Sequence, residues 1–103
     1  MTFDSVFAIF QKKDCAGAGC HGGARPAQGL NLSTAAIAQG ELINVTSQQC
    51  TAKKLVAPGD PTQSYLVNKL TGVGMCSGSQ MPKGGSALTN TELDTVRTWI
   101  SGL

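Results

Sequence analysis

The single histidine of this 103-residue chain lies in an arrangement that strongly limits what the chain can become. His21 follows Cys20 directly, and Cys15 stands five positions before Cys20. The pattern Cys-x-x-Cys-His is that of covalent c-type haem attachment, in which both thiols bond the porphyrin and the histidine ligates iron. Here four residues separate the cysteines instead of two. The segment is therefore a lengthened haem site, another metal site or a coincidence.

The composition fits one small domain that spans residues 1–103 and contains little bulky apolar material. Only five residues are aromatic, whereas thirteen are glycine (three Phe, one Tyr and one Trp make up the aromatic set). A buried prosthetic group would fill space that such side chains leave empty. The same composition is also found in small loop-rich domains without a cofactor, so it does not decide between them.

Charge and hydropathy argue against two classes of partner. The formal net charge is +2 and the basic residues are scattered, without the basic stripe and interleaved aromatics typical of nucleic-acid binding. No apolar run approaches the roughly 20 residues that a membrane span requires. The first residues also lack the basic start and apolar core of a signal peptide. We expect that Met1 replaces a removed leader, or that the chain is a domain of a longer protein.

Apolar spacing predicts helices in the first half of the chain. Residues 3–13 carry apolar side chains at three- and four-residue intervals, which makes one apolar face. A short helix is predicted over residues 34–39, with Ser33 as its N-cap, inside an otherwise irregular stretch from 22 to 58. The face of the first helix consists of Phe3, Val6, Phe7 and Phe10, and Thr2 or Asp4 is its expected cap.

Two further helices are predicted in the second half. Asp60 and Pro61 suit the N-cap and first position of a helix that stops at Gly72. After a loop over residues 72–88, Thr89 and Glu92 have the spacing of a capping box. The inward residues are expected to be Tyr65, Leu66, Leu70 and Val73 in one helix and Leu93, Val96, Ile100 and Leu103 in the other, with Trp99 at the edge.

The order of these blocks resembles a small bacterial class I cytochrome c. The closest resemblance is to a subgroup of monohaem domains from the cell envelope, and it covers nearly the whole chain. The resemblance implies an all-α fold of three main helices plus short helices and long loops wrapped around one haem. It also implies an electron carrier without enzymatic activity, in the periplasm or envelope, with redox proteins as partners. The matching blocks are residues 29–33, 58–61, 64–66, 69–70 and 81–85.

The resemblance also implies a role for each residue of the motif. Cys15 and Cys20 would form the thioethers to one haem c, and His21 would be the proximal iron ligand. Met81, before a proline in a glycine-rich loop, would be the sixth ligand, with Met75 as the rival. The lengthened spacer leaves open whether Cys15 is bonded to the haem at all. Glycine and alanine in the spacer suit the bulge that two extra residues require.

The remaining pocket residues follow from the same resemblance. The other ring nitrogen of His21 needs an acceptor to fix its tautomer, and a backbone carbonyl beside Pro26 is the expected one. Leu30 and Leu32 would pack against the proximal face of the porphyrin. The propionates would meet Arg25, Gln49, Lys53 or Lys54, among which spacing does not choose.

Cys50 and Cys76 are then left as a pair. In an oxidising envelope they predict a disulfide, with two unpaired thiols as the alternative. Two other functions stay open: a haem sensor or peroxidase-like domain in which Met81 is displaced, and a structural zinc module that uses His21 and three of the four cysteines. A plain disulfide between Cys15 and Cys20 is a further alternative.

Overall fold

In the computed structural model, the described part of the chain forms four α-helices and one short 3-10 helix. These are α1 (Phe3–Lys12), α2 (Ala35–Leu42), η2 (Pro61–Gln63), α3 (Tyr65–Thr71) and α4 (Asn90–Ser101). The structure describes residues 2–13, 15, 21, 30–77, 80–81 and 86–103. Within these ranges the only extended pairing consists of isolated bridges. The described residues therefore agree with the predicted all-α class.

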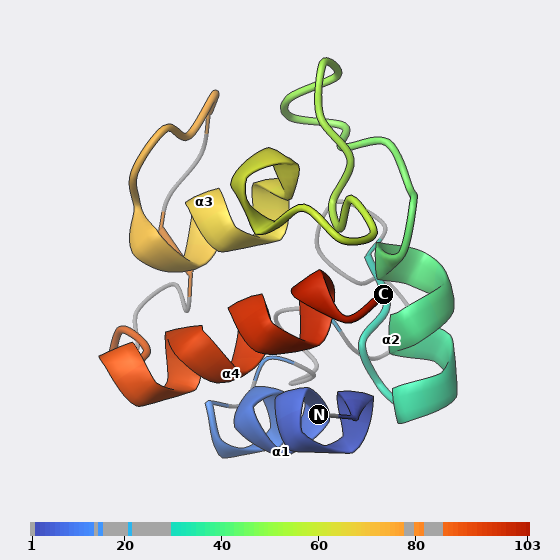
Figure 1. The fold of residues 1–103 in the computed structure, drawn as a ribbon, viewed down its shortest axis with the longest axis vertical. Helices are drawn as coiled ribbons and strands as arrows, with labels where there is room; N and C mark the ends of the chain where they lie inside the picture. Colours follow the sequence, from blue (N-terminus) through green and yellow to red (C-terminus); the bar gives the residue numbers. More distant parts are fainter. Residues whose placement is uncertain (1, 14, 16–20, 22–29, 78–79, 82–85) are drawn as a thin grey trace.

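Helix α4 lies in the middle of the helical frame (Figure 1). It packs against α1 on one side and α3 on the other, while α2 packs against α1. Val96 and Ile100 of α4 are fully buried. The centroids of the Trp99 and Phe3 rings are 4.9 Å apart. Burying side chains of this size stabilises the folded state by roughly 1.5–3 kcal/mol each. The packing of α4 against α1 and α3 therefore provides much of the stability of the core.

Two predicted core residues are exposed. Leu103 is 44% exposed and Val73 is 71% exposed, whereas Trp99 is only 4% exposed. Helix α4 ends at Ser101, so Leu103 no longer follows the helical face on which it was expected. Gly72 ends α3 with a φ of 76°, and this left-handed turn carries Val73 away from the core.

The predicted signals mark the end of α3 and the start of α4, but α3 begins later than predicted. Asp60 accepts a hydrogen bond from the backbone N–H of Thr62 at 3.1 Å and so caps η2, and Ser64 separates η2 from α3, which begins at Tyr65. Thr89 and Glu92 form the full capping box at the start of α4. Both caps satisfy backbone N–H groups that a helix leaves without partners.

At α2 the predicted cap is wrong by one residue. The Thr34 hydroxyl, not that of Ser33, accepts from the backbone of Ile37 at 3.2 Å. The Ser33 hydroxyl instead donates to the Asn31 side chain at 2.6 Å. Two neighbouring hydroxyl residues have the same capping propensity, so only the local turn decides between them.

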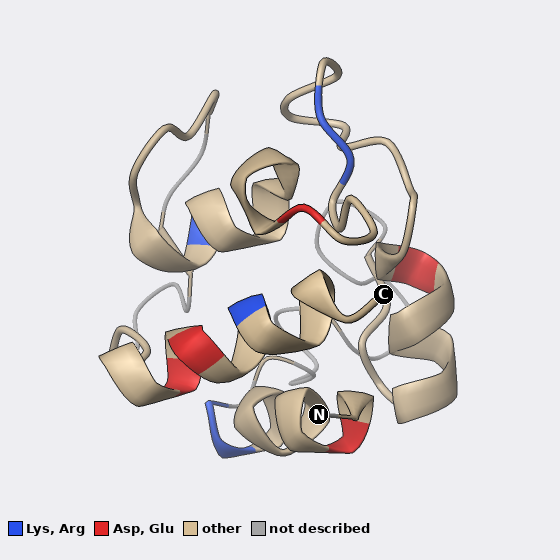
Figure 2. Ribbon diagram, in the orientation of Figure 1, with Lys and Arg blue, Asp and Glu red and all other residues tan. Residues whose placement is uncertain are grey.

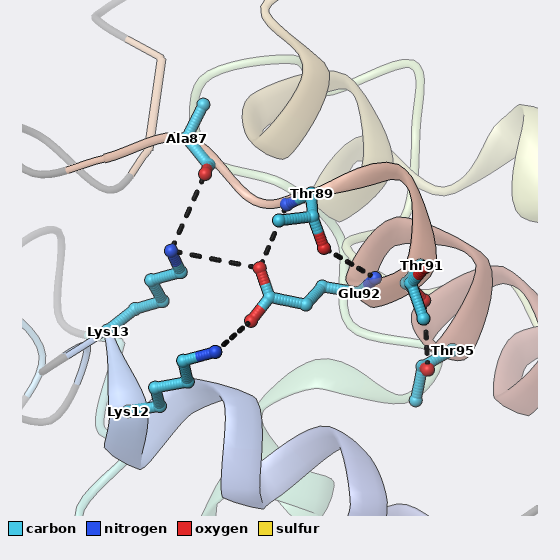
Figure 3. Close-up of polar contacts among 7 residues, drawn as sticks. All are labelled: Lys12, Lys13, Ala87, Thr89, Thr91, Glu92 and Thr95. Carbon is cyan, nitrogen blue, oxygen red and sulfur yellow. Dashed lines mark hydrogen bonds and ion pairs between the residues drawn. The ribbon is translucent and has the colours of Figure 1, made fainter.

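A carboxylate joins the end of α1 to the start of α4 (Figure 3). Glu92 lies 3.4 Å from the Lys12 ammonium and 3.7 Å from that of Lys13, and it accepts from the Thr89 backbone N–H at 2.8 Å. This backbone hydrogen bond, aided by the lysines, lowers the pKa of Glu92 below its ordinary value. The charged form of Glu92 therefore favours the folded state.

The packing of α4 predicts a contrast between two of its apolar residues. Ile100→Ala should lower the free energy of unfolding by about 2–5 kcal/mol, because it removes a fully buried side chain. Leu103→Ala should change it by less than about 0.5 kcal/mol, because Leu103 is exposed. Urea denaturation followed by circular dichroism measures both, and equal losses would contradict the described end of α4.

The Glu92 cluster predicts an acid-sensitive contribution to stability. Because the folded pKa is lowered, this contribution is complete above the ordinary value of 4.5 and is lost as the pH falls through the folded value. The urea midpoint of the wild type should thus fall more between pH 6 and pH 3 than that of Glu92→Gln. Parallel curves for the two proteins would show that the carboxylate contributes nothing.

Candidate functional site

The cysteine–histidine segment is attached to the end of α1. The backbone N–H of Cys15 donates to the Phe10 carbonyl at 2.8 Å, which satisfies one of the last carbonyls of the helix. The N–H of His21 then donates back to the Cys15 carbonyl at 3.0 Å. The two ends of the lengthened motif therefore lie one hydrogen bond apart. Cys20 lies outside the described residues.

The His21 ring is held in one tautomer. Its Nδ1 lies 3.1 Å from the Leu30 carbonyl oxygen. Since a carbonyl oxygen can only accept, Nδ1 is the donor of this bond, and in the neutral ring Nε2 then carries the lone pair. The backbone N–H of Leu32 also donates to the His21 carbonyl at 2.7 Å. A metal-binding histidine requires this kind of orientation, in which one ring nitrogen is fixed and the other presents its lone pair.

The described acceptor for His21 is the backbone carbonyl of Leu30. A backbone carbonyl beside Pro26 was the expected one, and this residue and its neighbours lie outside the described residues. Leu30 is half-buried against the core and Leu32 is 3% exposed within it. The same short segment thus provides both the hydrogen-bond acceptor and apolar surface.

Met81 is positioned by α3. Its backbone N–H donates to the Lys69 carbonyl at 2.8 Å, and the Gln80 side chain donates to the Leu70 carbonyl at 3.0 Å. Both bonds satisfy carbonyls that the end of α3 leaves without helical partners. Met81 is half-buried and packs against the same core as Cys15 and Leu30. The rival, Met75, directly precedes the disulfide-bonded Cys76.

The prediction of a disulfide between Cys50 and Cys76 is confirmed. Their Cα atoms are 5.4 Å apart and the bond joins the 47–53 loop to the loop that follows α3. Oxidised cysteines provide no thiolate, so this disulfide disfavours the alternative of a zinc module with three cysteine ligands. Among the described residues there is also no cluster of three or more His, Cys, Asp or Glu side chains suited to a metal ion.

The 42–56 segment connects the disulfide to α3. Across this segment, the backbone N–H of Asn44 donates to the Val56 carbonyl at 2.8 Å, and that of Leu55 donates to the Val45 carbonyl at 2.7 Å. The first amides of α3 then donate to the carbonyls of residues 54 and 55, both at 2.9 Å. The start of α3 and the Cys50 loop therefore belong to one hydrogen-bonded unit.

The basic residues expected near propionates have other contacts in the structure. Lys53 donates to the Asn68 side chain at 3.0 Å and Lys54 to that of Thr46 at 3.3 Å. Arg25 lies outside the described residues, and Gln49 is half-buried. Acidic and basic residues are spread over the helices in Figure 2, without a basic stripe in the described part.

A surface groove of about 560 Å³ lies along α3 and α4. Its described lining residues include Val67, Val73 and Arg97, but none of the predicted site residues. The groove is therefore separate from the cysteine–histidine segment.

Comparison of the chain with protein-family models, curated proteins and solved structures finds no match. No helix in the described ranges is long and apolar enough to cross a membrane.

The disulfide predicts a measurable loss of stability when it is removed. The chain-entropy model gives about 3.5 kcal/mol for closing a loop with a sequence separation of 26 residues. The double variant Cys50→Ala/Cys76→Ala should therefore unfold at lower urea concentration. Adding a dithiol reductant should lower the wild-type midpoint to a similar extent and leave that of the double variant unchanged. A reductant effect of equal size on both proteins would contradict this contribution.

Proposed function

We propose that the chain is a monohaem c-type cytochrome domain that carries electrons by outer-sphere transfer. The observation that carries the proposal is the His21 ring, whose Nδ1 proton is held by the Leu30 carbonyl. In the neutral ring this contact places the lone pair on Nε2, the nitrogen that would ligate iron. This ring stands in a segment closed onto Cys15, beside a second cysteine in the sequence.

The donors and apolar groups of this chain fit a haem. An imidazole, two neighbouring thiols and a thioether are the donor set of a covalently attached haem with His/Met ligation. Cys15, Leu30 and Met81 each reach the core while remaining partly exposed, as residues at the rim of a bound group would. A bound haem c would supply a one-electron couple at its iron.

The chain's own residues would then have distinct tasks. Cys15 and Cys20 would bond the haem covalently, and His21 and Met81 would occupy the two axial positions. With both residues as iron ligands, the haem would have no open position for a substrate, so the proposed domain would carry electrons and would not be an enzyme. Leu30, Leu32 and Pro26 would border the group and limit the access of water.

The disulfide supports the proposed location. Structural disulfides form and persist in oxidising compartments. The Cys50–Cys76 bond therefore favours a periplasmic or envelope setting, where the proposed redox partners would also be located.

The Met81 contacts favour a carrier over a haem sensor or a peroxidase-like domain. A sensor requires a sixth ligand that leaves easily, whereas the backbone of Met81 is fixed to the end of α3 at 2.8 Å. A stable thioether ligand would also raise the reduction potential, as it does in His/Met cytochromes.

Absorption spectra of wild type, Met81→Ala and Met75→Ala test this proposal. The reduced wild type should show a sharp α-band, and the oxidised form the weak red band that reports iron–sulfur ligation. Met81→Ala should lose the red band and lower the reduction potential, while Met75→Ala should keep both.

Each alternative has its own result in the same experiment. A wild type without visible absorption would overturn the haem assignment. Loss of the red band in Met75→Ala alone would move the sixth ligand to Met75. A wild type with haem but no red band would favour the sensor or peroxidase-like domain.

A further inference from the structure

The hydroxyl of Tyr65 lies at the centre of the turn that precedes Met81. Tyr65 is 1% exposed, and its hydroxyl accepts from the backbone N–H groups of Cys76 at 3.0 Å and Ser77 at 3.4 Å. The same hydroxyl donates to the Ser77 carbonyl at 3.3 Å. One proton and two lone pairs are the full hydrogen-bonding capacity of a phenol, so every one is used on this turn.

Lys69 reaches the same turn from the next turn of α3. It lies four residues after Tyr65 and thus on the same helical face. Its buried side chain donates to the Ser77 carbonyl at 3.3 Å. Two buried polar side chains of α3 therefore converge on residues 76 and 77.

The other end of the loop is attached to the same helix. Met81 donates to the Lys69 carbonyl and Gln80 to the Leu70 carbonyl, as described above. Helix α3 thus holds the loop before and after the segment that leads to Met81. The Cys50–Cys76 disulfide adds a second attachment at the first of these points.

We propose that Tyr65 is the positioning residue for the sixth ligand, and that its hydroxyl, through Cys76 and Ser77, holds the loop that leads to Met81. This inference rests on the proposed function. An external ligand binds only molecules in which Met81 has left the iron, so its apparent affinity rises with the population of open loops. The contacts of Tyr65 with the loop would thereby set how strongly Met81 competes with an external ligand for the iron.

Tyr65→Phe removes only the hydroxyl and leaves the ring volume unchanged. Losing a buried hydroxyl with three hydrogen bonds should increase the open population about tenfold. Imidazole titration of the oxidised holoprotein should therefore give an apparent affinity about tenfold higher than in the wild type. On warming, Tyr65→Phe should lose the red iron–sulfur band at a lower temperature than the wild type. The backbone amides of Cys76 and Ser77 should also exchange hydrogen faster than in the wild type.

Ser64→Ala is the matched control, because Ser64 is the neighbouring buried residue at the start of α3. Its hydroxyl contacts a different segment, with bonds of 2.8 Å to the Ala57 N–H and 2.9 Å to the Asp60 carbonyl. It should leave imidazole affinity unchanged, even if it lowers the midpoint of global unfolding.

Three results would overturn the inference. The first is an unchanged imidazole affinity in Tyr65→Phe when the wild type shows the iron–sulfur band. This result would overturn the inference and leave the proposed function intact. Equal effects of Tyr65→Phe and Ser64→Ala would show a general weakening of α3 instead of a specific contact. A wild type without haem would overturn the proposed function first, and this inference with it.

Discussion

The packing of α4 between α1 and α3 is the contact on which the rest of the structure depends. Helix α1 provides the attachment for Cys15, and through it for His21. Helix α3 provides the attachment for Met81. Because α4 packs against both helices through buried residues such as Val96 and Ile100, it fixes these two segments in one frame. The candidate ligands are 60 positions apart in the sequence, and this packing relates the two helices that hold them.

The two segments are held in different ways. Around His21 the contacts run along the chain, from the Phe10 carbonyl through Cys15 to Leu30 and Leu32. The Met81 loop is instead held from outside, by side chains and carbonyls of α3 and by a disulfide. A methionine sulfur is a neutral ligand without the directional support that a fixed tautomer gives to histidine. Its position therefore depends more on how firmly its loop is held.

The sequence predicted those features whose chemistry resides in side chains. The capping box of Thr89 and Glu92, the Asp60 cap and the Cys50–Cys76 pair each require particular residue types, so spacing revealed them. The Leu30 carbonyl that meets His21 had no signal in the sequence, because every residue carries the same backbone carbonyl. The exposure of Leu103 depended on where α4 ends, and the burial of Trp99 on its packing against Phe3; periodicity alone fixes neither.

The central claim is that Cys15, Cys20 and His21 form a covalent haem site. The most direct measurement is the mass of the denatured protein, produced in a host able to attach c-type haem and alkylated after reduction. The account predicts a mass increase of one haem, with Cys50 and Cys76 alkylated and with Cys15 and Cys20 protected. A protein of unchanged mass with all four cysteines alkylated would contradict it.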